Sequence, residues 1–120
     1  MTDAVDVLSK ARLLGEALAA HPRVQAMHAA QRSVHVDQAA QALLKQYQEH
    51  AAAIRRREAE GKPIEPADKR KLAELESGMA GNEALKRMMR AQADYLDLMN
   101  QVHETMDGAL TSKLQADAKS

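Results

Sequence analysis

Apolar residues recur every three or four positions from Leu85 to Leu110, and this pattern constrains the fold more than any other feature. Leu85, Gln92, Met99 and Met106 share one heptad position, Met88, Tyr95, Val102 and Ala109 share a second, and Met89, Leu96 and Leu110 widen the stripe. A three-column stripe over four heptads is typical of a helical bundle or a wide coiled coil. We therefore expect a last helix of about 29 residues, capped by Asn82 and about 43 Å long.

The remainder of the chain is also helical in pattern, and its helix breakers fall at His21-Pro22, at residues 61–66 and at residues 78–82. We expect helices from Asp3 to the residues before Pro22, from Pro22 through Val34, from the cap Asp37 to about Glu60, and from Pro66 to the Gly78–Gly81 stretch. The predicted fold is all-α, a bundle-like five-helix chain with a long antiparallel helical hairpin whose tip carries residues 55–71. One domain is expected over residues 3–110, followed by a polar, disordered tail at residues 111–120.

Composition limits the core that such a chain can build. Phe, Trp and Cys are absent, and Tyr47 and Tyr95 are the only aromatic residues. A core of Ala, Leu, Val, Ile and Met is thin in a small domain, and a homodimer would relieve that shortage. The predicted self-association residues are Leu85, Met88, Tyr95, Leu96, Met99 and Val102.

Few residues suggest a chemical site. Without cysteine the chain has no disulfide, thiolate metal site or cysteine nucleophile. His21, His28 and His35 are seven residues apart, or about 10.5 Å along a helix, too far to share one ion. His103 and Asp107 are four apart, but two ligands do not make a metal site. We expect no enzyme, no catalytic residue, no cofactor and no metal.

The N-terminus carries acids where a signal peptide needs basic residues, and no window approaches the roughly 18 to 20 apolar residues of a membrane span. The sequence therefore predicts a cytoplasmic protein with no membrane partner.

The predicted hairpin tip concentrates charge in a chain that is neutral overall. Its basic residues are Arg55, Arg56, Arg57, Lys62, Lys69, Arg70 and Lys71; four acids reduce the net charge of residues 55–71 to +3. Such a tip could contact RNA phosphates or an acidic protein. Interleaved acids weaken the field and no aromatic residue is present to stack a base, so a solvated tip is the alternative.

The order of these features resembles the YlbF/YmcA family (Com_YlbF) of small helical bacterial regulators. The resemblance rests on the Ala/Leu-patterned first helix, Pro22-x-Val24, the stretch from Asp37 to Tyr47, Gly61 after a polar helix end, and Asn82-Glu-Ala-Leu85 before the long last helix. Where Asn82 is followed by Glu83, many members have Asn-Pro. The resemblance covers about residues 3–110.

This resemblance implies a dimeric helical protein without catalysis. Relatives take part in regulatory complexes linked to competence, sporulation, biofilm formation and ribonuclease-dependent mRNA processing, so other regulatory proteins and a ribonuclease complex are implied partners. Some of those complexes are associated with cysteine-bound iron–sulfur clusters, and a chain without cysteine does not share that feature.

The leading hypothesis is therefore a regulatory or adaptor protein acting through protein–protein interaction, and the alternative is an RNA-binding hairpin that uses residues 55–71. A metal carrier or bundle enzyme built around His103 and Asp107 is a third possibility. A coiled-coil holdase with a Met-lined client surface is a fourth.

Overall fold

The computed structural model describes residues 3–119, and in that range it contains five helices and no strand. The helices are α1 (Val5–Ala19), α2 (Pro22–Val36), α3 (Gln38–Ala59), α4 (Pro66–Gly81) and α5 (Glu83–Lys119). The predicted all-α class and the five helices are confirmed. The described chain divides into two compact units, a first unit of residues 3–27 with 91–119 and a second unit of residues 28–90. The chain passes from one unit to the other inside α2 and again inside α5.

Two side chains cap helices at the positions that the sequence predicts. The Asp37 carboxylate accepts a hydrogen bond from the Ala40 N–H at 2.9 Å and begins α3. The Asn82 side-chain oxygen accepts from the Leu85 N–H at 3.0 Å and begins α5. Each satisfies one of the amides that a helix start leaves without an intrahelical partner.

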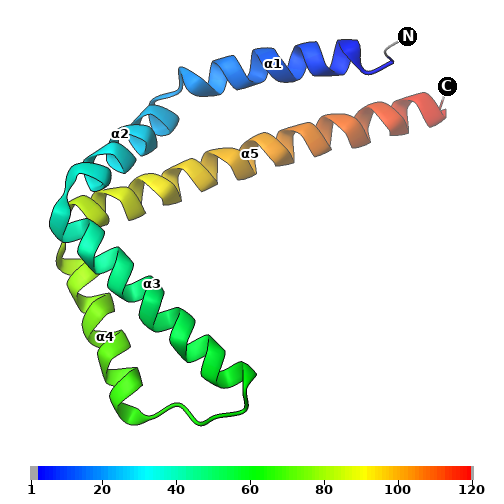
Figure 1. Ribbon diagram of the computed structural model, residues 1–120. Coiled ribbons are helices and arrows are strands. Elements are labelled where there is room, and N and C mark those ends of the chain that lie inside the picture. The colour runs from blue at the N-terminus through cyan, green and yellow to red at the C-terminus, as the bar shows by residue number, and fades with distance from the viewer. Residues whose placement is uncertain (1–2, 120) are drawn as a thin grey trace. The chain divides into compact units, whose positions relative to one another are not determined.

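In the second unit, α3 and α4 form an antiparallel hairpin joined by residues 60–65 (Figure 1). The chain leaves α3 through Gly61, whose φ of +72° is in the left-handed region. The Lys62 N–H donates to the Arg57 carbonyl at 2.8 Å and the Gly61 N–H to the Glu58 carbonyl at 3.1 Å, which is the Schellman pattern. The loop between α3 and α4 thus forms the tip, within the predicted range of residues 55–71.

The core of the second unit is small. Val34, Ala40 and Leu85 are buried at its centre. The side chains packed against them are those of Leu43, Leu44, Met79, Ala84 and Met88. Aliphatic and Met side chains alone make this cluster, as the composition predicts.

Close packing of the hairpin also depends on Gly78 of α4. A Cβ atom at that position would lie 3.1 Å from Leu43 Cδ2, which is tighter than ordinary van der Waals contact. The absence of a side chain at Gly78 therefore lets α4 approach α3 closely at this level.

The first unit is held differently. No residue of α1 is buried. The junction between α1 and α2 is fixed by polar contacts: the His21 ring Nδ1 accepts from the Arg23 N–H at 3.1 Å, and Gln25 Nε2 donates to the Ala19 carbonyl at 3.3 Å. Pro22 then occupies the first position of α2, where its missing N–H costs nothing.

The last helix is longer than the sequence analysis expects. α5 has 37 residues against the expected 29 or so, because residues 111–119 continue the helix to Lys119 and do not form the predicted disordered tail. This segment contains no Pro or Gly, and Leu, Lys, Gln and Ala in it are good helix formers.

Candidate interaction surfaces

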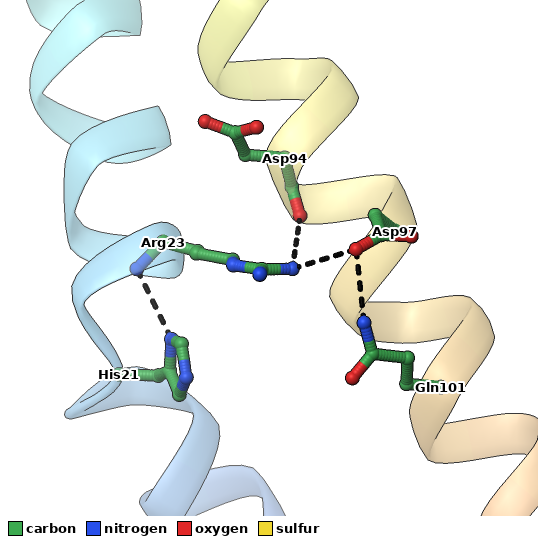
Figure 2. A network of polar contacts seen from close by, with 5 residues as sticks. All are labelled: His21, Arg23, Asp94, Asp97 and Gln101. Atoms are coloured by element: carbon green, nitrogen blue, oxygen red, sulfur yellow. Dashed lines mark hydrogen bonds and ion pairs between the residues drawn. The ribbon is translucent and has the colours of Figure 1, made fainter.

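A polar contact in the first unit joins the start of α2 to α5 (Figure 2). Arg23 Nη1 donates to the Asp97 carboxylate at 2.9 Å and to the Asp94 carbonyl at 3.4 Å. Gln101 Nε2, one turn further along α5, donates to the same Asp97 oxygen at 2.9 Å. The first turn of α2 therefore lies beside the 94–101 stretch of α5. The sequence alone does not predict this contact, because no local spacing relates Arg23 to Asp97.

One apolar stripe of α5 is partly covered. Ala91 is buried, and Tyr95, Leu98 and Val102 are half-buried. These residues follow one another at spacings of four, three and four, so they share one side of the helix. We call these four residues the covered stripe, because neighbouring parts of the chain shield their side chains from solvent.

A second apolar stripe lies on a neighbouring side of α5 and is largely exposed. It consists of Leu96, Met99, His103, Met106 and Leu110, which we call the α5 seam. Leu96 is 58% exposed, Met106 and Leu110 are similar, and only Met99 is half-buried. The spacing of three and four residues is that of a and d positions in a heptad.

The first helix presents a further exposed apolar surface. Val7, Leu8, Ala11 and Leu14 lie along one side of α1 and are all exposed, Val7 by 69%. We call these four residues the α1 face. An uncovered face on a regular helix and an uncovered seam on a second helix together exceed the scattered single exposures of an ordinary surface.

The six residues predicted for self-association fall into three environments. Leu85 has no exposed surface and belongs to the core of the second unit, against which Met88 packs. Tyr95 and Val102 lie on the covered stripe, while Leu96 and Met99 lie on the α5 seam. The structure therefore does not bring all six to one surface. The heptad pattern of the sequence marks all three rows of apolar side chains on α5 alike, and it does not reveal which row packs within its own chain.

The seven basic residues predicted at the tip are all exposed, but they do not form one patch. Arg55, Arg56 and Arg57 are consecutive, so each points about 100° away from the previous one. Arg57 forms an ion pair with Asp68, and Lys62 Nζ lies 3.0 Å from Glu60 Oε2.

On α4, Lys69, Arg70 and Lys71 likewise point in three directions. Lys71 lines a depression of about 440 Å³ between α3 and α4, together with Gln46, Glu49, His50, Ala53 and Leu75. The basic side chains therefore surround the tip.

Asp68 organises this tip, a role that the sequence prediction does not include. Its carboxylate accepts from Arg57 and, at 3.3 Å, from the Glu65 N–H that precedes α4. Its carbonyl lies 2.7 Å from His50 Nε2 on α3. The position of Asp68 three residues after Glu65, at the start of a helix opened by Pro66, is the signal that could have found it.

The candidate metal residues are dispersed. His103 and Asp107 are both exposed on α5, and no group of three His, Asp or Glu within residues 3–119 is placed to hold a metal ion. His28 and His35 line a depression of about 420 Å³ on α2 with Gln31, Arg32 and Val36. All five residues are exposed, so this depression is open to solvent. No helix in the described range is long and apolar enough to cross a membrane.

Residues 7–111 match the family described as "Control of competence regulator ComK, YlbF/YmcA". No curated protein and no solved structure matches the chain. The family match extends from α1 into the second half of α5 and so includes both units. The chain therefore belongs to the YlbF/YmcA family, a family of competence regulators.

Proposed function

We propose that this protein is a non-enzymatic regulatory adaptor that self-associates through the exposed part of α5 and acts by binding other proteins. The observation that carries the proposal is the α5 seam, a heptad-spaced row of apolar side chains that solvent reaches. Large exposed apolar patches mark interaction surfaces, and Met side chains adapt to different partner shapes. Family membership supports a regulatory role.

Self-association is tested by sedimentation of a charged seam variant. Met99→Asp places a carboxylate among apolar side chains that would be buried in the complex, so the variant should sediment as a monomer at micromolar concentration. Thr105→Asp introduces the same charge on the other side of α5 and serves as the control. A Met99→Asp variant that sediments like the unsubstituted protein contradicts this surface.

The adaptor role is tested by recovering tagged protein from its native host, with and without nuclease, and identifying bound proteins by mass spectrometry. A nuclease-resistant regulatory protein or ribonuclease, lost with Met99→Asp and kept with Thr105→Asp, is the expected result. Recovery of material that disappears with nuclease would contradict the role.

Direct RNA binding by the tip is the second candidate. The observation in its favour is the ring of exposed basic side chains around residues 55–71, which carry a net charge of +3. Each phosphate contact would steepen the salt dependence of affinity. Binding of single-stranded RNA should then weaken sharply from 50 to 200 mM salt and vanish when Arg55, Arg56 and Arg57 are all replaced by Glu. RNA binding unchanged by that triple replacement excludes the tip.

A further inference from the structure

We propose that the α1 face of one copy packs on the α5 seam of a second copy, so that two chains exchange their first helices reciprocally. This inference rests on the proposed self-association and names the surfaces that meet. The occupant of the α5 seam is thus a second copy of this chain, and its α1 is the element that binds.

The α1 helix needs a cover that its own chain does not provide. It has 15 residues, a length at which an isolated helix is marginal in water. None of its residues is buried, and all four residues of the α1 face are exposed, while Leu18, the next residue on that side of α1, is half-buried. Packing of an amphipathic face is the usual source of stability for such a helix.

The polar contacts at the junction after α1 coexist with an uncovered α1. His21 Nδ1 and Gln25 Nε2 fix the exit from α1, and Arg23 fixes the next turn to Asp97 and to the Asp94 carbonyl. With these hydrogen bonds in place, the α1 face and the α5 seam of the first unit both remain open to solvent.

The two surfaces match in chemistry, and the α1 helix is as long as the seam, although the α1 face from Val7 to Leu14 spans only about 10 Å of it. At 1.5 Å per residue, α1 is about 22 Å long and the seam from Leu96 to Leu110 about 21 Å. The side chains on the α1 face are apolar, and His103 is the one polar member of the α5 seam. The side chains of the α1 face would therefore cover about half the length of the seam, and the remainder of α1 would lie along the other half.

Charge favours α1 over a second α5 as the element that covers the seam. Residues 91–112 contain four acids (Asp94, Asp97, Glu104 and Asp107) and no Lys or Arg. Asp107 follows His103 by one turn and so borders the α5 seam. Of these four acids only Asp107 borders the seam, so a second α5 seam would add another Asp107 to this surface, whereas α1 brings Lys10, which lies beside Val7 and Leu14.

The buried area is adequate for a dimer. The large apolar side chains involved are Val7, Leu8 and Leu14 on α1 and Leu96, Met99, Met106 and Leu110 on α5. At roughly 60 to 120 Å² for each side chain, these seven give roughly 400 to 800 Å² from each copy. Reciprocal contacts about a two-fold axis use this set in both copies, and a standard interface buries about 800 Å² per partner.

The chain contains no cysteine, so disulfide crosslinking can test the contact without background. Ala11→Cys in a chain carrying a size tag is mixed with untagged Met99→Cys, His103→Cys or Met106→Cys, refolded together and oxidised. These positions sample the register along the seam, since a disulfide forms only when Cα atoms are within about 7 Å. Ser9→Cys mixed with Thr105→Cys is the matched control, because both residues point away from the proposed contact.

We expect a covalent tagged–untagged dimer from at least one seam position, in at least tenfold higher yield than from the control pair. Two further measurements distinguish failure of helix exchange from failure of self-association. The doubly substituted chain Ala11→Cys/His103→Cys shows whether the crosslink forms within one chain or between two, and sedimentation of the reduced protein shows whether it is a dimer. If the protein is dimeric but its crosslinks form within one chain, or no seam position exceeds the control, helix exchange is overturned while self-association stands. A monomer at all concentrations overturns both.

Discussion

Arg23 and Asp97 tie the first turn of α2 to α5, with 2.9 Å between Arg23 Nη1 and Asp97 Oδ2. The same guanidinium nitrogen also reaches the Asp94 carbonyl. The contact spans 74 positions of sequence, so it forms only when the first unit is folded. It is therefore a specific probe of how the α1–α2 junction is anchored.

The strength of this ion pair is expected to be small. The two side chains are 40% and 62% exposed, and exposed pairs contribute about 0.2 to 1 kcal/mol. A double-mutant cycle with Arg23→Ala and Asp97→Ala, followed by thermal unfolding, should give a coupling in that range that shrinks at 1 M salt. A coupling well above 1 kcal/mol, or one insensitive to salt, would show that the two side chains are less exposed to solvent than in this structure.

Replacement of a core residue and of a seam residue should have different signatures. Leu85→Ala removes a fully buried side chain and should lower the free energy of unfolding by about 2 to 5 kcal/mol at any protein concentration. Leu96→Ala should act mainly through the complex, so its effect on the melting temperature should depend on protein concentration. Melting curves at several concentrations separate the two, and a concentration-independent loss in Leu96→Ala would contradict the assignment of Leu96 to an interface.

The turn after α3 should be sensitive to the residue at position 61. Gly61→Ala forces a side chain into a φ of +72° and should cost about 1 to 2 kcal/mol. Gly61→Asn should cost less, since Asn tolerates this region better. Chemical denaturation of both variants checks the order, which would be contradicted if Ala and Asn were equally tolerated.

The start of α2 should depend on the ring of His21. His21→Ala removes the acceptor of the Arg23 N–H and should destabilise the first unit by about 0.5 to 2 kcal/mol. His21→Asn supplies a side-chain oxygen as a new acceptor and should recover most of the loss. Circular dichroism measures the helix content and the thermal unfolding of both variants. An equal loss of stability in the two variants would show that the imidazole does not act as a helix cap.

The sequence predicts local structure well where a single side chain determines it. The caps at Asp37 and Asn82 and the proline starts at Pro22 and Pro66 are local, and the structure has all four at helix starts. The family resemblance is also confirmed. The long-range roles of Arg23 and Asp68 were missed, because they depend on which helices meet.

The division of α5 into two stripes was missed for a related reason. Leu85 and Leu96 look alike in a heptad plot, yet one is in the core and the other is exposed. Only the packing of neighbouring helices separates them. The single domain over residues 3–110 stays a prediction, and coincident loss of all helical signal on unfolding would support it.

The arrangement of basic side chains at the hairpin tip also has a kinetic consequence. Consecutive residues on a helix point about 100° apart, so charges at positions 55–57 and 69–71 surround the α3–α4 tip. An acidic partner would therefore be attracted from several directions of approach, but no single geometry would engage all the charges at once. Electrostatic attraction of this kind accelerates encounter much more than it slows dissociation. If the partner is acidic, we expect the tip to determine how quickly it associates, and apolar contacts elsewhere to determine how long the complex lasts.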